Sequence, residues 1–235
     1  MSLIYPQTFL DLVQRTFVEC ACSGTEPSTL VGVTGEASRI TNWVSGAWLS
    51  IQQAHEDWQF LESSFSFVTI AGQASYTPTE AGITAGTFGL WKTWDDLPRN
   101  YITATGVSSE FEMSERSWEA WRILYDFGAL KDIRTRPVEF SIAPNKSFVL
   151  GPYPAAGHTV TGKYFTAPVP LLLDVDVPTL PRQYLMAIVG GAMMEYAGFK
   201  AASEVYQRGK QWYDQHIGRI ELARLPKIQS SGALC

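Results

Sequence analysis

The placement of proline most constrains how this chain can fold. Of its thirteen prolines, most lie between residues 78 and 181, whereas residues 28–77 and 182–225 contain none. Proline lacks a backbone donor and clashes with the preceding turn inside a helix. Long helices are therefore expected only in the two proline-free blocks, and the middle of the chain is expected to be rich in strands and turns.

Two helices are predicted before residue 62. Apolar residues recur at helical spacing in residues 6–22, and Gly24 and Pro27 follow as stop signals. A longer helix is predicted after Thr34, which suits a helix N-cap. Its apolar face comprises Ile40, Val44, Ala47, Ile51, Ala54 and Trp58.

Two more helices are predicted near the C-terminus, over residues 182–199 and 201–224. The first carries Leu185, Ile188, Val189, Ala192, Tyr196 and Phe199 on one side. Gly190 and Gly191 lower its intrinsic stability, but they permit the backbone of another element to approach closely.

The middle of the chain reads as short strands separated by Gly, Pro and Asn. The predicted strands lie at 64–70, 72–76, 87–92, 138–142, 147–150 and 159–166. One helix is expected among them, capped by Ser114 and ended by Gly128. Its apolar face would comprise Trp118, Trp121, Leu124 and Tyr125.

Together these elements predict an α+β fold, in which N- and C-terminal helices form a helical bundle with a β-rich insertion. Residues 1–62 and 178–225 are assigned to the bundle and residues 63–177 to the insertion. Residues 226–235 are expected to form a flexible tail. The sequence contains no apolar stretch of about 20 residues, so no membrane span is predicted, and its start lacks the pattern of a signal peptide.

The charge pattern argues against general nucleic-acid binding and favours assembly. The net charge is −5 and only 17% of residues are charged, below the usual 25% or so. A basic phosphate-binding surface is therefore not expected. Residues 1–62 carry seven acids and two bases, whereas residues 178–235 carry four acids and seven bases. These ends attract each other, within one copy or between neighbours. The many aromatic residues fit either an interface or the core.

No residue pattern indicates a cofactor, a metal or a catalytic nucleophile. His55, His158 and His216 lack ligand-like partners at helical spacing. The spacing of Cys20 and Cys22 is not that of a zinc or redox pair, and the loop 30–36 lacks the Lys-Ser/Thr of a phosphate loop. The chain is therefore not expected to be an enzyme.

Tryptophan and acidic residues in the insertion support an alternative interpretation. Asp95 and Asp96 follow Trp91 and Trp94, and several glutamates lie near Trp118 and Trp121: Glu110, Glu112, Glu115 and Glu119. Glycosidases use two carboxylates, and aromatic platforms bind sugars. This pattern permits a tail-associated carbohydrate-binding or hydrolytic domain. Lys131, Arg134 and Arg136 form a small basic cluster, expected to be a solvated loop or an inter-subunit salt bridge rather than a DNA contact.

The ordered series of segments resembles the head-to-tail adaptor (connector) proteins of short-tailed phages. The resemblance extends over about residues 6–225, and no single motif carries it. The segments that match are 8–15, 35–52, 55–61, 72–76, 136–142, 151–154, 164–168 and 176–184.

The resemblance implies a structural virion protein at the head–tail junction, assembled in the host cytoplasm. It implies a ring of twelve copies of the chain that binds the portal protein, receives the tail nozzle or tail tube, and contacts the passing DNA transiently and without specificity. In such adaptors the C-terminal segment grips the portal. Mapped onto this chain, that segment comprises Pro226, Lys227, Ile228, Gln229, Leu234 and Cys235. The partner of the β-rich insertion stays open, with the tail as one candidate. A globular protein of another role remains the third hypothesis.

Overall fold

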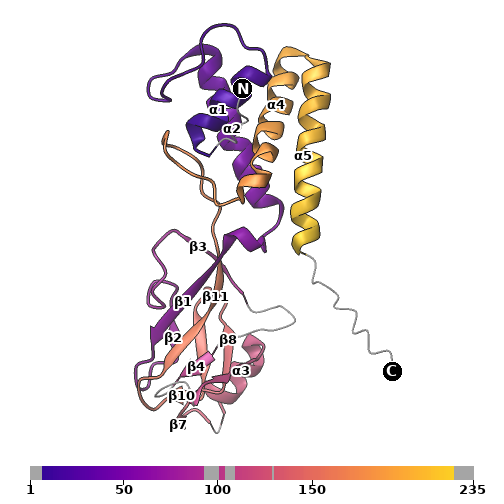
Figure 1. The fold of residues 1–235 in the computed structure, drawn as a ribbon. Helices are drawn as coiled ribbons and strands as arrows, with labels where there is room; N and C mark the ends of the chain where they lie inside the picture. Colours follow the sequence, from indigo (N-terminus) through magenta and orange to yellow (C-terminus); the bar gives the residue numbers. More distant parts are fainter. Residues whose placement is uncertain (1–6, 93–100, 104–108, 129, 225–235) are drawn as a thin grey trace, which may run out of the picture. The chain divides into compact units, whose positions relative to one another are not determined.

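The computed structural model describes residues 7–92, 101–103, 109–128 and 130–224. It combines helices with strands, which confirms the mixed α and β class. The chain forms two compact units (Figure 1). The helical unit comprises residues 1–60 and 168–235, and the β-rich unit comprises residues 61–167.

The helical unit begins with α1 (Phe9–Glu19) and α2 (Gly35–Ala54). A capping box starts α1, because the Thr8 hydroxyl accepts the Asp11 amide while the Asp11 carboxylate accepts the Thr8 amide. Thr34 is the N-cap residue of α2, as predicted, although its side chain makes no capping bond. A 3₁₀ turn, η1 (Gln59–Leu61), follows α2.

The unit is completed by η3 (Arg182–Tyr184), α4 (Met186–Lys200) and α5 (Ser203–Arg224). α4 contacts α1, α2 and α5 and is buried along most of its length, so it is the central helix. Figure 1 shows α4 and α5 running side by side as an antiparallel pair.

Glycines bring α4 against its two main neighbours. A Cβ added to Gly190 would lie 2.6 Å from the Gly209 carbonyl oxygen of α5, and one added to Gly209 would lie 2.8 Å from the Gly190 carbonyl oxygen. On another side, a Cβ on Gly191 would lie 2.9 Å from the Ala47 Cβ of α2. The close approach predicted for the small residues is therefore confirmed.

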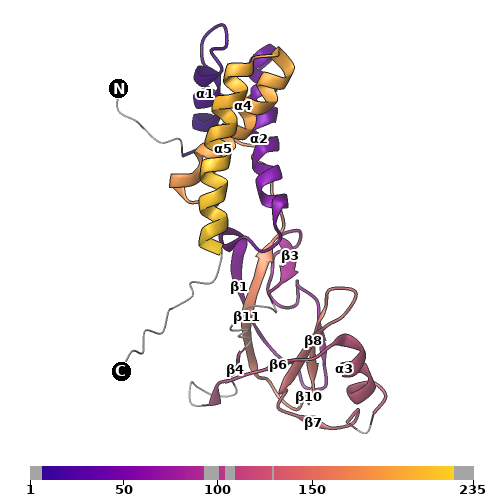
Figure 2. The ribbon, with the colours of Figure 1, turned by 90° about the vertical axis from the view of Figure 1, so that its right-hand side faces the viewer.

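The described residues of the β-rich unit form three sheets. The largest has the order β1-β11-β4-β5, with β3 also paired to β11. Its strands are β1 (Glu62–Val68), β3 (Phe88–Trp91), β4 (Tyr101–Thr103), β5 (Phe111–Glu112) and β11 (Thr159–Thr166). β1 and β11 pair antiparallel from Glu62 opposite Phe165 to Val68 opposite Thr159, and they run together in Figure 2.

The second sheet has the order β2-β9-β8-β6, and the third pairs β10 with β7. The second comprises β2 (Ser75–Tyr76), β6 (Ser114–Glu115), β8 (Glu139–Ile142) and β9 (Phe148–Gly151). The third comprises β7 (Arg134–Thr135) and β10 (Tyr153–Pro154). A short helix, α3 (Trp118–Tyr125), packs on β8.

Aromatic side chains fill the core of the β-rich unit. Phe140 and Phe148 stack with centroids 5.0 Å apart, and Phe65 meets Trp91 edge-on at 4.9 Å. Among the described residues, the aromatic side chains that rank as strongly exposed are Phe127, Phe199 and Tyr206. The high aromatic content therefore serves mainly the core, and it does not by itself indicate an interface.

The structure corrects several local predictions. Ser114 lies in β6, and the N-cap of α3 is Ser117. The two- and three-residue strands β4, β5, β6, β7 and β10 were not predicted, because pairing with a neighbour rather than local propensity creates them. Phe199, assigned to the apolar face of α4, is 53% exposed. None of the described helices combines the length and apolar character needed to cross a bilayer.

Substituting Gly190 tests the contact between α4 and α5. Alanine has the higher helix propensity, but at position 190 its Cβ would clash with backbone atoms of α5. Gly190→Ala is expected to lower the free energy of unfolding by about 1–3 kcal/mol, measured by chemical denaturation. Gly198→Ala is the matched control, since no atom lies within 4 Å of its added Cβ. It is expected to be neutral or stabilising, and equal effects of the two variants would contradict the contact.

Candidate functional site

The most prominent apolar surface of the helical unit is a loop of residues 168–178, here called the strap. It carries five aliphatic side chains that are 52–74% exposed. They are Val169, Leu172, Leu173, Val175 and Val177. Residues 168–177 had been assigned to the β-rich insertion, but they hydrogen-bond to α1 and α2 and belong to the helical unit.

The start of the strap is clamped to α2 by a buried glutamine. The Gln52 amide group donates to the Val169 carbonyl at 3.0 Å and accepts the Val169 amide at 3.1 Å. Gln52 is only 2% exposed, and its amide nitrogen also donates to the Trp48 carbonyl at 3.4 Å, so these bonds satisfy a buried polar group that would otherwise be costly. The Ser45 hydroxyl adds a bond to the Leu171 carbonyl at 2.9 Å, and the Leu171 side chain is buried.

The far part of the strap is tied to α1 and to the loop before α2. The backbone amides of Phe9 and Leu10 donate to the carbonyls of Asp176 and Asp174. These are first-turn amides of α1 without helical partners, so the strap satisfies them. The Asp174 carboxylate accepts the Thr29 hydroxyl at 2.7 Å and the Leu30 amide at 3.0 Å.

The Asp176 carboxylate shapes the strap itself. It accepts the backbone amides of Leu172 at 2.7 Å and Leu173 at 2.8 Å. These donors, Leu173 first, lower the pKa of the carboxyl below its usual value. The strap is thus a loop anchored by several hydrogen bonds, and its aliphatic side chains point to solvent. Exposed apolar surface of this kind is typical of a protein–protein contact.

Opposite charges of the first and last blocks meet within one copy of the chain. Lys200 of α4 lies 3.0 Å from Glu36 of α2, and Arg208 of α5 lies 3.6 Å from Glu19 of α1. Part of the attraction expected from the charge asymmetry therefore holds the helical unit together.

The histidines and cysteines do not gather into a site. Among the described residues, no group of three or more His, Cys, Asp or Glu side chains could hold a metal ion. His55 packs edge-on against Trp58 at 4.7 Å and lies 3.4 Å from Glu221. Cys20 and Cys22 are free thiols, and burial, aided by Cys22, raises the pKa of Cys20 to about 12. Such a thiol is a poor nucleophile.

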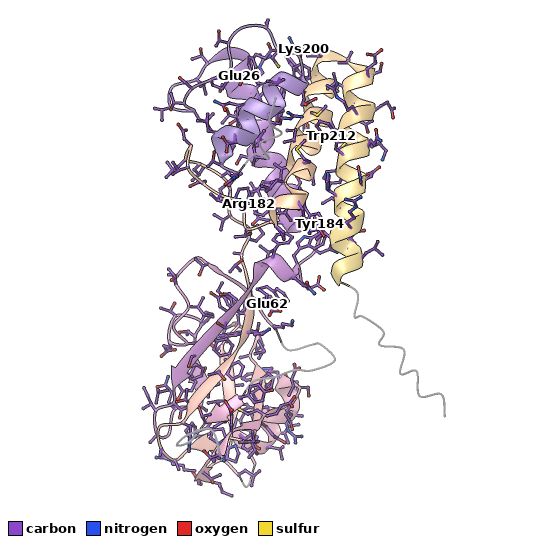
Figure 3. The ribbon with its side chains drawn as sticks, in the orientation of Figure 1. Glu26, Glu62, Arg182, Tyr184, Lys200 and Trp212 are labelled. Atoms are coloured by element: carbon purple, nitrogen blue, oxygen red, sulfur yellow. The ribbon has the colours of Figure 1, made fainter. Side chains whose placement is uncertain are left out.

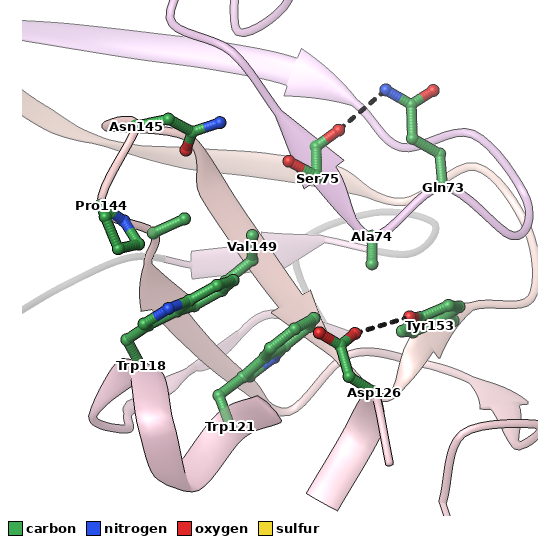
Figure 4. Close-up of a pocket in the computed structure, with 11 residues that line it drawn as sticks. Gln73, Ala74, Ser75, Trp118, Trp121, Asp126, Pro144, Asn145, Val149 and Tyr153 are labelled. Atoms are coloured by element: carbon green, nitrogen blue, oxygen red, sulfur yellow. Dashed lines mark hydrogen bonds between the residues drawn. The ribbon is translucent and has the colours of Figure 1, made fainter. Parts of the chain in front are cut away.

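A pocket of about 540 Å³ lies in the β-rich unit beside α3. Trp118 and Trp121 stack in parallel at 5.5 Å in its wall, and the Tyr153 hydroxyl donates to Asp126 (Figure 4). Trp121 is only 2% exposed, so it offers little of its face to a sugar.

The acidic residues named near these tryptophans do not line that pocket. Asp126 is the one carboxylate among its lining residues, whereas a glycosidase needs two across the scissile bond. Glu110, Glu112, Glu115 and Glu119 are exposed to solvent elsewhere. Trp94, Asp95 and Asp96 lie outside the described residues. The described part of the unit does not assemble the site that the alternative interpretation requires.

The partly buried charges of Arg116 and Glu139 serve the structure of the β-rich unit. Arg116 binds Glu139 through two nitrogens, and the Tyr125 hydroxyl donates to the same carboxylate. Arg116 first, and Tyr125 after it, lower the pKa of Glu139, and burial raises the pKa of Tyr125 to about 12. Both groups therefore keep one protonation state near neutrality, which does not suit acid–base catalysis.

The three residues of the basic cluster, Lys131, Arg134 and Arg136, have different environments. Arg136 donates to the carbonyls of Ile102 and Ser109 and lies over the Phe111 ring at 4.3 Å, so it joins loops of the β-rich unit. Arg134 and Lys131 are exposed.

The predicted portal-binding segment comprises six residues near the C-terminus. Pro226, Lys227, Ile228, Gln229, Leu234 and Cys235 lie outside the described residues. The strap was not predicted from the sequence. The signal was present in Pro168–Pro178, where aliphatic residues run almost uninterrupted between prolines with two aspartates among them.

Removing the Asp176 carboxylate tests the rigidity of the strap. Asp176→Ala is expected to expose the Leu172 and Leu173 amides and to lower local stability by about 1–2 kcal/mol, seen as faster amide hydrogen exchange there. Asp214→Ala is the control, because its carboxylate pairs with the exposed Lys210 of α5. Unchanged exchange at residues 172–173 in Asp176→Ala would contradict the proposed anchoring.

The lowered pKa of Glu139 predicts a pH dependence of stability. Because the folded-state pKa lies below the unfolded value of about 4.3, the carboxylate stabilises the fold above that pH, and the effect is lost as pH falls through the folded pKa. Glu139→Gln is expected to cost about 1 kcal/mol at pH 7, since the Arg116 side chain is 36% exposed and partly screened. The gap to the native protein should close on acidification in urea melts. Glu119→Gln, on a 74% exposed side chain, should match the native protein throughout.

A comparison with known protein families shows to which family the chain belongs. The SU10 adaptor protein family matches residues 7–231, which span both units. A comparison with curated proteins gave no match. The family match extends over nearly the whole chain and agrees with a protein whose described polar groups serve structure rather than chemistry. The chain belongs to the SU10 adaptor protein family and is a structural adaptor protein of a phage.

Proposed function

We propose that this adaptor forms a ring that joins the portal of the phage head to the tail nozzle or tail tube and surrounds part of the DNA channel. The family match over residues 7–231 carries the proposal. The resemblance to connector proteins of short-tailed phages adds the position at the head–tail junction and a ring of twelve copies.

The exposed strap supports assembly with other proteins. Its five aliphatic side chains lie on a loop that the helical unit holds in place. A loop fixed before binding loses little conformational entropy when a partner covers it. An adaptor needs such surfaces, because a ring requires two different patches on each copy.

The overall charge supports a channel through which DNA slides. Proteins that hold DNA neutralise its phosphates with lysine and arginine. This chain has a net charge of −5, so it lacks the general positive charge that would retain the genome. Contact with passing DNA is transient and non-specific in this proposal.

The two ends of the junction are assigned to different parts of the chain. The C-terminal segment 226–235 grips the portal, as the corresponding segment does in the connector proteins that the chain resembles; it is largely polar, with Ile228 and Leu234 as apolar residues, and can order on a partner. The β-rich unit faces the tail. Portal, tail protein and further copies of the chain are then its partners in the virion, with no cofactor and no membrane involved.

Reconstitution tests this function directly. The purified chain is mixed with the portal protein of the same phage, and complexes are imaged by electron microscopy and counted by mass. The expected product is a portal carrying a closed ring of adaptors that then accepts the tail protein. A chain that binds neither the portal nor any tail protein would overturn the proposal.

Deleting residues 226–235 is expected to weaken attachment to the portal without affecting the fold. All described elements end before residue 225, so the melting temperature should stay within about 2 °C of that of the full chain, a shift expected of well under 1 kcal/mol. Co-sedimentation with the portal should fall at least about tenfold. Unchanged co-sedimentation, or a collapse of the melting temperature, would contradict this role of the segment.

A further inference from the structure

The helical unit has a second surface that matches the strap in chemistry. A hollow of about 250 Å³ opens where α2, α4 and α5 meet. It is smaller than the roughly 300–1,000 Å³ of small-molecule sites, but it has room for aliphatic side chains. Its apolar lining comprises Trp43, Gly46, Ala47, Gly191, Met194 and Tyr213.

Glycine creates this hollow. Gly191 lets α4 approach Ala47 of α2, which forms the floor. Gly46 is exposed above it, and a Cβ added there would meet no atom within 4 Å. The missing side chain of Gly46 therefore leaves the space open, although glycine weakens the middle of a helix.

The strap and the hollow occupy different faces of the same unit. Ser45 and Gln52, which hold the strap, share one face of α2, because seven residues make nearly two turns. Gly46 and Ser50 of the hollow lie about 100° and 140° further around the helix. In Figure 1 the strap lies beside α1, on the side of the unit away from α5. One copy can therefore offer its strap to one neighbour and its hollow to another.

Charges beside the two surfaces are complementary. Arg182, exposed just after the strap, is labelled in Figure 3. Glu195, exposed, lines the hollow. In the described part of the chain neither side chain has an ion-pair partner within its own copy, whereas Lys200 and Arg208 do. The strap's own carboxylates, Asp174 and Asp176, are partly exposed, but both are engaged by hydrogen bonds to the loop before α2 and within the strap.

We propose that the strap of one copy docks into the hollow between α2, α4 and α5 of the next copy, with Leu172 and Leu173 filling the hollow and Arg182 pairing with Glu195 across the interface. This inference rests on the proposed ring and names its subunit contact. The contact is heterologous, and such a contact repeats around a closed ring. A stable interface buries about 800 Å² on each partner. The exposed strap side chains supply on the order of half of that area, and the flanking helices supply the rest.

Filling the hollow tests the contact. Gly46→Leu adds a side chain where the copy itself has space, and leucine favours helix over glycine, so the fold should be at least as stable. Self-association, measured by analytical ultracentrifugation and by counting adaptors bound to the portal, should weaken at least about tenfold. Gly218→Leu on α5 is the matched control, since its added Cβ also meets no atom within 4 Å, and it should assemble normally. Normal assembly of Gly46→Leu would overturn the inference.

Reversing the charges tests the pairing. Arg182→Glu and Glu195→Arg should each weaken association about tenfold, because like charges then face each other. The double variant should return to within about threefold of the native chain. A double variant no better than the singles would overturn the pairing.

A strap variant separates failure of the contact from failure of the ring. Leu172→Ser with Leu173→Ser should keep the native melting temperature and lose adaptor–adaptor association, while Leu222→Ser, at an exposed position of α5, should lose neither. If the strap variant forms native rings but loses the portal, the strap contacts the portal, and this inference fails while the ring stands. If the native chain binds the portal only as separate copies, the proposed ring itself fails.

Discussion

The helical unit depends on the contact between the backbones of α4 and α5 at Gly190 and Gly209. Each glycine lies so close to the carbonyl oxygen of the other that a side chain at either position would push the two helices apart. The two helices can therefore pack closely enough for α4 to be covered by α5 on one side and by α2, through Gly191 and Ala47, on another. Because α4 is apolar and buried on most sides, it is the central helix of the unit, and the other helices pack around it.

The strap follows from this arrangement. Once α4 has placed α2 and α1, their outer faces present Gln52, Ser45 and the first amides of α1, and the chain between Ala167 and α4 satisfies them. Satisfying these groups turns the strap backbone inward and its aliphatic side chains outward. The exposed apolar surface is thus a consequence of hydrogen bonds that the helical unit requires, and in the proposed assembly a partner removes that surface from water.

The polar groups of the β-rich unit fit the same structural role. Glu139 is paired with Arg116 and Tyr125, and Arg136 is used to hold loop carbonyls. Partly buried charges need such partners to offset their desolvation, so these contacts give the three charged side chains a structural role. The pocket beside α3 has an aromatic wall and one lining carboxylate, so it does not reproduce a hydrolase. This agrees with a protein whose activity is assembly.

The sequence by itself determined where the helices lie and that small residues bring one of them close to another, because proline placement and helical periodicity act over a few neighbouring residues. It also predicted the longer strands, such as β1 and β11, from their alternating pattern. Only the tertiary structure decided what depends on distant partners. The shortest strands exist because a neighbour pairs with them, the cap of α3 is Ser117 rather than Ser114, and most aromatics belong to the core. The strap belongs to the helical unit because of a distant partner too. Gln52 and Val169 are 117 residues apart in sequence, so no local sequence pattern could predict their hydrogen bonds.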